Sequence, residues 1–264
     1  MFDSFDFDTY RDVLRRLSRD RPCVGFPRAL EMRGSPYCLI RHDVDFSVSS
    51  ALRMAALEAE LGISATYFLL FSADYNLLAP QNSRFPRALV EMGHEVGLHY
   101  DSAAVAAFTP DEAVELLRAQ AALLGMLAGA PVRVIARHTP SFGGRDPMEG
   151  TEFINAYDPA FTSEITYISD SCGAWRDNAV ETLAADEPPF NVQLLIHPIF
   201  WDEDAADRWT RLEHLRVARL EELDDLVAAV QTIWSEHAGV VEHDRRCGQA
   251  AASRAAAEIL RDRG

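Results

Sequence analysis

The sequence predicts an α/β protein built on a mostly parallel sheet. Short apolar runs typical of strands alternate along the chain with amphipathic segments typical of helices. The 264 residues are 48% hydrophobic and 25% charged, a composition that excludes general disorder. A single barrel accommodates six or seven such strand–helix units in a chain of this length, and a doubly wound open sheet is the alternative.

The first half of the chain begins with a helix and continues with strand–helix units. Tyr10, Val13, Leu14 and Leu17 share one face of the opening helix, and Asp8 is its expected cap. The next expected elements are strand 37–41, helix 49–61 ended by Gly62, strand 65–71, a short helix over 84–92 ended by Gly93, and strand 94–100.

The second half opens on a marked helix start. Thr109, Pro110 and Glu112 supply a cap, a first-turn proline and a capping box for a helix that runs to about residue 127. The remaining expected elements are strands 132–138, 166–170 and 192–198, a helix over about 217–236, and an Ala-rich helix over 249–262. We expect residues 1–240 to form one domain and residues 241–264 a C-terminal helical appendage.

Charge and motif content exclude several classes of function. The chain has 25 basic and 41 acidic residues, a formal net charge of −16, which argues against nucleic acid or an anionic membrane surface as the main partner. No apolar run reaches the ~18 residues of a membrane span. No glycine-rich phosphate-binding motif follows a strand. A small or neutral ligand is expected; the oligomeric state is left open.

The N-terminus and the cysteines indicate a cytoplasmic protein. The acidic start lacks the basic and apolar regions of a secretory signal. The cysteines at positions 23, 38, 172 and 247 form no CxxC pair, so reduced thiols are expected rather than a disulfide framework or a cysteine-only zinc site.

Residues capable of metal binding or proton transfer stand where the expected strands end. These blocks are Arg41-His42-Asp43-Val44-Asp45, His99-Tyr100-Asp101, Arg137-His138, Asp170 and His197-Pro198. The carboxyl ends of parallel strands carry the active site in such folds. Asp43 and Asp45 fall on one face of a strand, where two carboxylates repel unless a cation or a shared proton compensates. Aspartate and histidine ligands with an open position describe a catalytic zinc or similar site.

The ordered motifs between residues 39 and 201 resemble the polysaccharide deacetylase superfamily (carbohydrate esterase family 4), in its RHDVD-type bacterial branch. The matching strings are RHDVDFS, ELGISATYFLL, EMGHEVGLHYD, RHTPS, INAYD, YISDSCGAW and LLIHPIFW. The resemblance implies a distorted (β/α) barrel of about seven strands, a divalent metal, and hydrolysis of an N-acyl group on a sugar.

The chain departs from the family pattern at two places. The family's adjacent aspartates are split here by Val44, so the resemblance makes Asp45 the metal ligand and Asp43 the catalytic base. Its two metal histidines are four residues apart, but here only His99 is present and Ala103 takes the second place. We expect His138 to be the third ligand, with Asp101 and His42 as the next choices.

Other site roles follow from the same resemblance. Arg137 is expected to orient the base, and His197 to act as general acid with Asp170 holding its charge. Aromatic walls against a sugar ring are expected from three side chains that suit core packing equally well: Tyr100, Trp175 and Trp201. His94 is expected to be structural, and no role is expected for His214, His237 and His243.

The predicted function is therefore a metal-dependent deacetylase that removes an N-acyl group, in the simplest case N-acetyl, from an amino sugar or a sugar-containing intracellular precursor. The expected metal is Zn²⁺, although Co²⁺, Ni²⁺ and Mn²⁺ also accept such ligands. Two alternatives remain open: hydrolysis of another C–N bond, of the cyclic amide or ureide type, and carbohydrate binding without turnover, which the missing histidine at position 103 favours.

Overall fold

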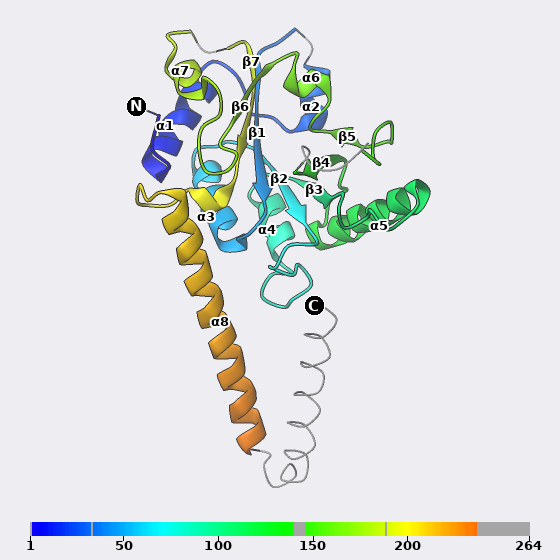
Figure 1. The fold of residues 1–264 in the computed structure, drawn as a ribbon. Coiled ribbons are helices and arrows are strands. Elements are labelled where there is room, and N and C mark those ends of the chain that lie inside the picture. Colours follow the sequence, from blue (N-terminus) through cyan, green and yellow to red (C-terminus); the bar gives the residue numbers. More distant parts are fainter. Residues whose placement is uncertain (1, 33, 140–145, 188, 237–264) are drawn as a thin grey trace, which may run out of the picture. The chain divides into compact units, whose positions relative to one another are not determined.

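The computed structural model describes residues 2–32, 34–139, 146–187 and 189–236 (Figure 1). The chain divides into two compact units, Met1–Leu212 and Glu213–Gly264. The first unit contains the sheet and every predicted site residue. The predicted appendage over 241–264, together with its helix over 249–262, lies outside the described residues, and so do His237 and His243.

A seven-stranded parallel sheet forms the centre of the first unit, in the order β5-β4-β3-β2-β1-β7-β6. It confirms the predicted distorted (β/α) barrel, and β5 and β6 form its edges. The strands are β1 (Tyr37–Val44), β2 (Thr66–Leu70), β3 (Glu95–Asp101), β4 (Val134–His138), β5 (Ile154–Asn155), β6 (Thr166–Ser169) and β7 (Asn191–Ile196). The sequence does not predict β5, because two residues are too short to show a strand pattern.

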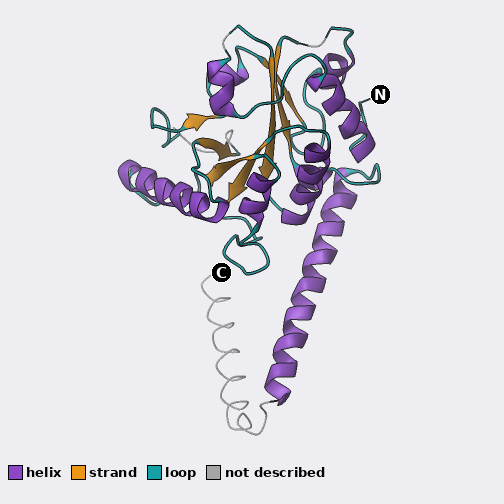
Figure 2. Cartoon of the chain, turned by 180° about the vertical axis from the view of Figure 1, so that it is seen from behind, coloured by secondary structure: helices purple, strands orange, loops and turns teal. Residues whose placement is uncertain are grey.

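Helices precede, connect and follow the strands, and they are drawn in purple in Figure 2. They are α1 (Phe7–Ser18), α2 (Phe26–Glu31), α3 (Val48–Glu60), α4 (Phe85–Glu91), α5 (Pro110–Ala128), α6 (Pro159–Thr162), α7 (Ala179–Ala184), the 3₁₀ turn η1 (Pro198–Phe200) and α8 (Arg208–Glu236). The capping box of Thr109 and Glu112 is confirmed. The predicted cap of α1 is wrong: Asp6, not Asp8, accepts the hydrogen bond from the Thr9 amide. Among the described residues, no helix combines the length and the apolar character that crossing a bilayer requires.

The inner face of the sheet has an apolar floor at the amino ends of the strands. Leu39 of β1, Phe68 of β2 and Val134 of β4 pack there against Phe26 of α2 and Phe161 of α6. The two helical phenylalanines meet edge to face, with ring centroids 5.0 Å apart. Because this end is filled with side chains, polar groups on the same face gather at the other end, where the carboxyl ends of the strands form the mouth of the barrel.

The outer face of β1 carries a buried polar cluster instead. His42 Nε2 lies 2.6 Å from Glu58 Oε1 on α3, and the hydroxyls of Tyr10 and Tyr67 also donate to the Glu58 carboxylate. Burial alone would raise the pKa of Glu58, but the His42 charge holds that pKa below its ordinary value. His94 lies beside this cluster with its ring bonded to the backbone at Ala55 and Ala65, so its contacts are structural ones, as expected.

Gly97 of β3 is required by the close approach of its neighbours. An added Cβ would stand 2.5 Å from Phe68 Cε1 and 2.9 Å from Val134 Cγ2. We expect Gly97→Ala to lower the free energy of unfolding by roughly 1–3 kcal/mol, as overpacked cores do, measured by urea denaturation. Phe68→Leu should cost less in the Gly97→Ala background than in the wild type. Additive costs would show that the methyl group and the ring do not compete for space.

Candidate metal and catalytic centre

The inner face of β1 presents a buried ion pair just below the mouth. Arg41 donates from Nε to Asp43 Oδ1 at 2.8 Å and from Nη2 to Asp43 Oδ2 at 2.7 Å. Burial alone would raise the pKa of Asp43, but the charge and the hydrogen bonds of Arg41 hold this pKa below its ordinary value. Asp43 is therefore a carboxylate of fixed orientation.

Arg41, and not Arg137, is the arginine that pairs with the predicted base. Both side chains of the pair point to the same face of β1 because two residues separate equivalent positions on a strand. The Arg41 guanidinium also lies over the rings of Tyr157 and Phe68, at 4.3 and 5.2 Å from their centroids. Arg137 donates from Nε to Ser102 Oγ at 3.1 Å, so the expectation that it orients Asp43 is corrected.

Asp45 follows β1 at the mouth and faces two histidines from neighbouring strands. Its Oδ1 lies 3.3 Å from His99 Nε2 of β3 and 3.3 Å from His138 Nδ1 of β4. The two ring nitrogens are 3.2 Å apart. The structure thus brings together Asp45, His99 and His138, the three residues expected to bind a metal, with ligand atoms all within 4.8 Å of one another.

The hydrogen bond of His99 to a backbone carbonyl suits a cation at this group. His99 Nδ1 lies 2.7 Å from the carbonyl oxygen of Ala136 and must donate its proton there, because a carbonyl can only accept. In the neutral ring Nε2 then presents a lone pair to Asp45, whose Oδ1 is buried and receives no hydrogen bond. Metal-binding histidines are commonly held in this way by a backbone carbonyl. The two nitrogens and the carboxylate oxygen therefore fit a divalent transition metal.

His197 directly follows β7 and approaches the same cluster, held in place by hydrogen bonds to Asp170. Its Nδ1 lies 2.6 Å from Asp170 Oδ1, and its backbone amide donates to the same carboxylate at 3.0 Å. Trp201 Nε1 donates to Asp170 Oδ2 at 2.8 Å. Nε2, the other ring nitrogen of His197, lies 3.9 Å from Asp45 Oδ2. Burial would lower the pKa of His197, but the charge and hydrogen bond of Asp170 raise it to about 9, so the imidazolium form prevails at neutral pH.

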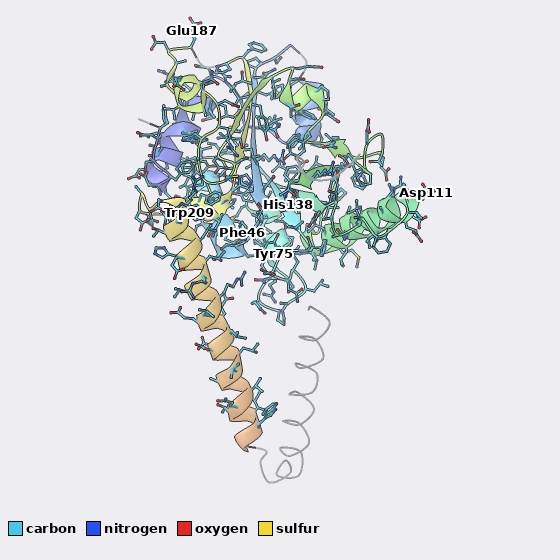
Figure 3. The ribbon with its side chains drawn as sticks, viewed as in Figure 1. Phe46, Tyr75, Asp111, His138, Glu187 and Trp209 are labelled. Atoms are coloured by element: carbon cyan, nitrogen blue, oxygen red, sulfur yellow. The ribbon has the colours of Figure 1, made fainter. Side chains whose placement is uncertain are left out.

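Two residues at the mouth, Tyr75 and Phe46, were not anticipated from the sequence. The Tyr75 hydroxyl donates to the carbonyl of Val44 at 2.7 Å and accepts from the amide of Leu70 at 2.8 Å, which ties the end of β1 to the end of β2. Phe46 follows Asp45 and leaves 41% of its surface exposed. Phe46, Tyr75 and His138 lie together at this end of the sheet in Figure 3. No local pattern marks Tyr75, because it acts across a loop.

The three aromatic side chains expected against a sugar ring are packed into the protein. Trp201 is only 1% exposed and supports Asp170. Tyr100 is buried and its hydroxyl donates to Asp146. Trp175 is half-buried, with its ring against Phe5 and its Nε1 donating to the carbonyl of Phe2. Core packing, the other use considered for them, therefore describes Tyr100 and Trp201.

The two alternative metal ligands, His42 and Asp101, are not part of this group. His42 points to the outer face of β1 and pairs with Glu58, as described above. Asp101 Oδ1 accepts from the amide of Ala103 at 2.8 Å, where the chain leaves β3. Asp45, His99 and His138 are therefore the residues whose side chains come together as candidate metal ligands. His214 belongs to the second unit and is exposed.

A cavity of about 660 Å³ lies at the ends of β3 and β4. Some of its lining residues are close in sequence to His99 and His138. Arg137 and Thr139, on either side of His138, contribute to its wall, and an apolar side is supplied by the start of α5. Its lining includes Asp101, Ser102, Arg137, Thr139, Phe108 and Val114.

Comparison with known proteins gives matches among solved structures only. No protein-family model matches the chain, and no curated protein matches it. Among solved structures, the chain is similar to a carbohydrate esterase family 4 pseudoenzyme from Bacillus anthracis, at 17% identity and a TM-score of 0.42 over 72% of this chain and 62% of that one. It therefore spans less than two thirds of that protein.

Two further structures show similar values. The peptidoglycan deacetylase PdaC from Bacillus subtilis matches at 15% identity and a TM-score of 0.46, over 75% of this chain and 96% of that one. A family 4 carbohydrate esterase from Streptomyces lividans, in complex with acetate, matches at 16% identity and a TM-score of 0.42, over 62% of this chain and 80% of that one. The pseudoenzyme and the Streptomyces enzyme belong to the family that the sequence motifs resemble.

The buried ion pair of β1 yields a stability prediction. Arg41→Met leaves the Asp43 carboxylate buried without its cation, and we expect a loss of roughly 3–5 kcal/mol in the free energy of unfolding at pH 7. Urea denaturation measures the loss, and Arg41→Met/Asp43→Asn is the control, which should recover most of it.

The pH dependence of that loss gives a second readout. The pKa of Asp43 is depressed in the folded state, so its contribution is complete above the ordinary value of 3.8 and disappears as the pH falls through the lower folded value. In Arg41→Met burial raises the pKa of Asp43, so the difference in stability from the wild type should begin to narrow above pH 3.8, where the variant's carboxyl takes up a proton, and should narrow further below pH 3.8. A difference that is constant with pH would mean that Arg41 stabilises by packing alone.

Proposed function

We propose that this protein is a metal-dependent hydrolase that removes an N-acyl group, most simply acetyl, from an amino sugar. The observation that carries the proposal is the convergence of Asp45, His99 and His138 between a carboxylate, Asp43, and an imidazolium, His197. Asp43 Oδ2 lies 3.6 Å from His99 Nε2, and His197 Nε2 lies 3.9 Å from Asp45 Oδ2. A base and an acid thus reach one cation site from two sides.

Each member of this group has a distinct task. A divalent metal held by Asp45, His99 and His138 would polarise the acyl carbonyl and lower the pKa of water. Asp43 takes the proton of the attacking water. Arg41 occupies both of its oxygens, but each carboxylate oxygen has a second lone pair that remains open to a proton.

His197 serves as the general acid. Its Nδ1 proton is committed to Asp170, so the proton that leaves is the one on Nε2, which faces the cluster. An amide expels its amine only when the nitrogen is protonated, and the imidazolium supplies that proton as the C–N bond breaks. Asp170 compensates the positive charge before transfer and keeps the ring oriented afterwards.

The surroundings of the cluster indicate how a sugar would be held. Phe46, the residue after Asp45, leaves 41% of its surface exposed, and a sugar ring would approach the cluster beside it. The cavity beside β3 and β4 would take the part of the substrate beyond the reacting amide.

The alternative of binding without turnover rests on Ala103, which stands in place of a histidine in the family motif. His138 from the neighbouring strand lies within 3.3 Å of Asp45 and completes a group of three without a ligand at position 103. This arrangement favours turnover. Hydrolysis of another C–N bond would use the same residues, so a panel of N-acetylated amino sugars against cyclic amides and ureides separates the two reactions.

Metal content and activity should separate the roles of the two aspartates. We expect about one divalent metal per chain in the wild type after remetallation, and the same content in Asp43→Asn, since a base acts through its proton affinity. Asp45→Asn should lose the metal, because a ligand acts through its charge. Both variants should lose ~10²–10⁴-fold or more in turnover. Elemental analysis and the amino-sugar assay measure the two properties.

The opposite pattern, with the metal lost in Asp43→Asn and kept in Asp45→Asn, would exchange the roles. Wild-type protein that binds no metal after remetallation would end the proposal. His214→Ala is a matched control, because its histidine is exposed and lies outside the first unit.

The role of His197 predicts a dependence on the leaving group. His197→Ala should lower turnover of an N-acetyl amide by roughly 10²-fold, as removal of a general acid does. It should affect an activated aryl acetate much less, because that leaving group departs without a proton. Steady-state kinetics on both substrates measure the difference.

The amide reaction should also fall as the pH rises through about 9, where His197 loses its proton, and Asp170→Asn should move this limit to lower pH. Equal losses on amide and ester, together with a large fall in melting temperature, would instead mark His197 as a structural residue.

A further inference from the structure

Two cysteines face each other at the start of β1, at the end of the sheet opposite the proposed catalytic cluster. Cys23 and Cys38 form an isolated parallel bridge. The Cys38 amide donates to the carbonyl of Pro22 at 3.0 Å, and the Cys38 carbonyl accepts from the amide of Val24 at 3.0 Å. Cys23 therefore lies directly opposite Cys38, as residues of adjacent parallel strands do.

This register meets the main geometric condition for a disulfide. Neighbouring strands are ~4.8 Å apart, and disulfides join residues whose Cα atoms are ~4.4–6.8 Å apart. Residues paired in this way project their side chains to the same side of the two strands, and the Cys23 thiol is close enough to Cys38 to shift its pKa. Cys23 stands in a short connecting segment outside any named strand or helix, where the backbone can adjust as the bond closes.

The two thiols differ in access. Cys38 is fully buried, whereas Cys23 is half-buried and reachable from solvent. The hydrogen bond with Cys23, followed by burial, raises the pKa of Cys38 well above its ordinary value, while the charge of Arg21 opposes this rise. Cys23 is accordingly the thiol that an external reagent meets first, and Cys38 is placed to react second.

We propose that Cys23 and Cys38 are a redox modification site that closes reversibly into a disulfide by exchange with a small-molecule disulfide of the glutathione class. The Cys23 thiolate attacks one sulfur of the reagent and releases one thiolate. The Cys38 thiolate then attacks the Cys23 sulfur of the mixed disulfide and expels the second. Two protein thiols are oxidised, one reagent disulfide is reduced to two thiols, and the protons of the protein thiols end on the released ones.

The covalent link would clamp one segment of the fold. It closes a loop over residues 24–37, which contains α2, and Phe26 of that helix packs in the apolar floor. A loop of this length should raise the melting temperature by about 5–10 °C when it is closed. Cys38 is five residues before Asp43, about 16 Å along an extended strand, so oxidation should leave the mouth as it is.

The test uses the full chain with the other two cysteines replaced, Cys172→Ser/Cys247→Ser. This protein is incubated with oxidised glutathione, alkylated to block remaining thiols, and digested with trypsin. We expect a cross-linked pair of peptides, 20–28 with 34–41, lighter than the sum of the two by two hydrogen atoms, and a melting temperature that rises on oxidation and returns with a reductant.

Cys23→Ser in the same background is the matched control, since this half-buried side chain tolerates a serine. It should give no cross-link, keep the Cys38 thiol, and show no rise in melting temperature. A wild-type pair that stops at glutathione on Cys23 with Cys38 alkylated, or that cross-links without any change in melting temperature, would overturn the proposal. These readouts are independent of hydrolase activity.

Discussion

The ion pair between Arg41 and Asp43 is the interaction on which the arrangement of the mouth depends. Three carboxylates, Asp43, Asp45 and Asp170, gather where the strands end, and each would repel the others in a region of low solvent access. Arginine keeps its charge at any working pH, so Asp43 stays ionised whatever happens to the histidines. A buried pair of this kind contributes little net stability. The pair instead fixes the orientation of the Asp43 carboxylate, because each of its oxygens accepts a hydrogen bond from Arg41 of the same strand.

Support for His197, the proposed general acid, comes from a part of the chain far away in sequence. Asp170 is held by Trp201, and the Trp201 ring packs against Phe5 and Tyr10, with centroids 4.8 and 5.1 Å away. The N-terminal segment thus stabilises the orientation of His197 although it contributes no group to the cluster. Tyr75 does the same for the base side by fixing Val44. Both supports act through one intermediate residue, so the polar groups of the mouth rest on ordinary aromatic packing.

The sequence predicted what depends on local pattern and missed what depends on register. Alternating strands and helices, the capping box at Thr109, and the convergence of Asp45, His99 and His138 all follow from periodicity and from the rule that parallel strands end together. Short elements escaped, although α2 and α4 share the string FPRAL and the second could have indicated the first. The sequence prediction assigned Arg137 to orient the base, because a strand end does not reveal which arginine turns inward. Trp201 and Tyr100 are buried and do not line the mouth. The sequence pattern could not predict this, because it does not show how deeply a given aromatic side chain is buried.

The alternation of β1 has a consequence for anyone who would move this centre to another scaffold. Arg41 and Asp43 face inward, while His42 between them faces outward into the carboxylate of Glu58 on α3. A recipient barrel given only the string RHDVD would bury the imidazole of the histidine without a carboxylate to pair with it. Inserting or deleting one residue within the string would move each following side chain to the opposite face of the sheet. Charged side chains would then be buried without partners on both faces. The transplantable unit is therefore β1 together with α3 and the tyrosines that meet Glu58, and homologous chains should vary in length only outside it.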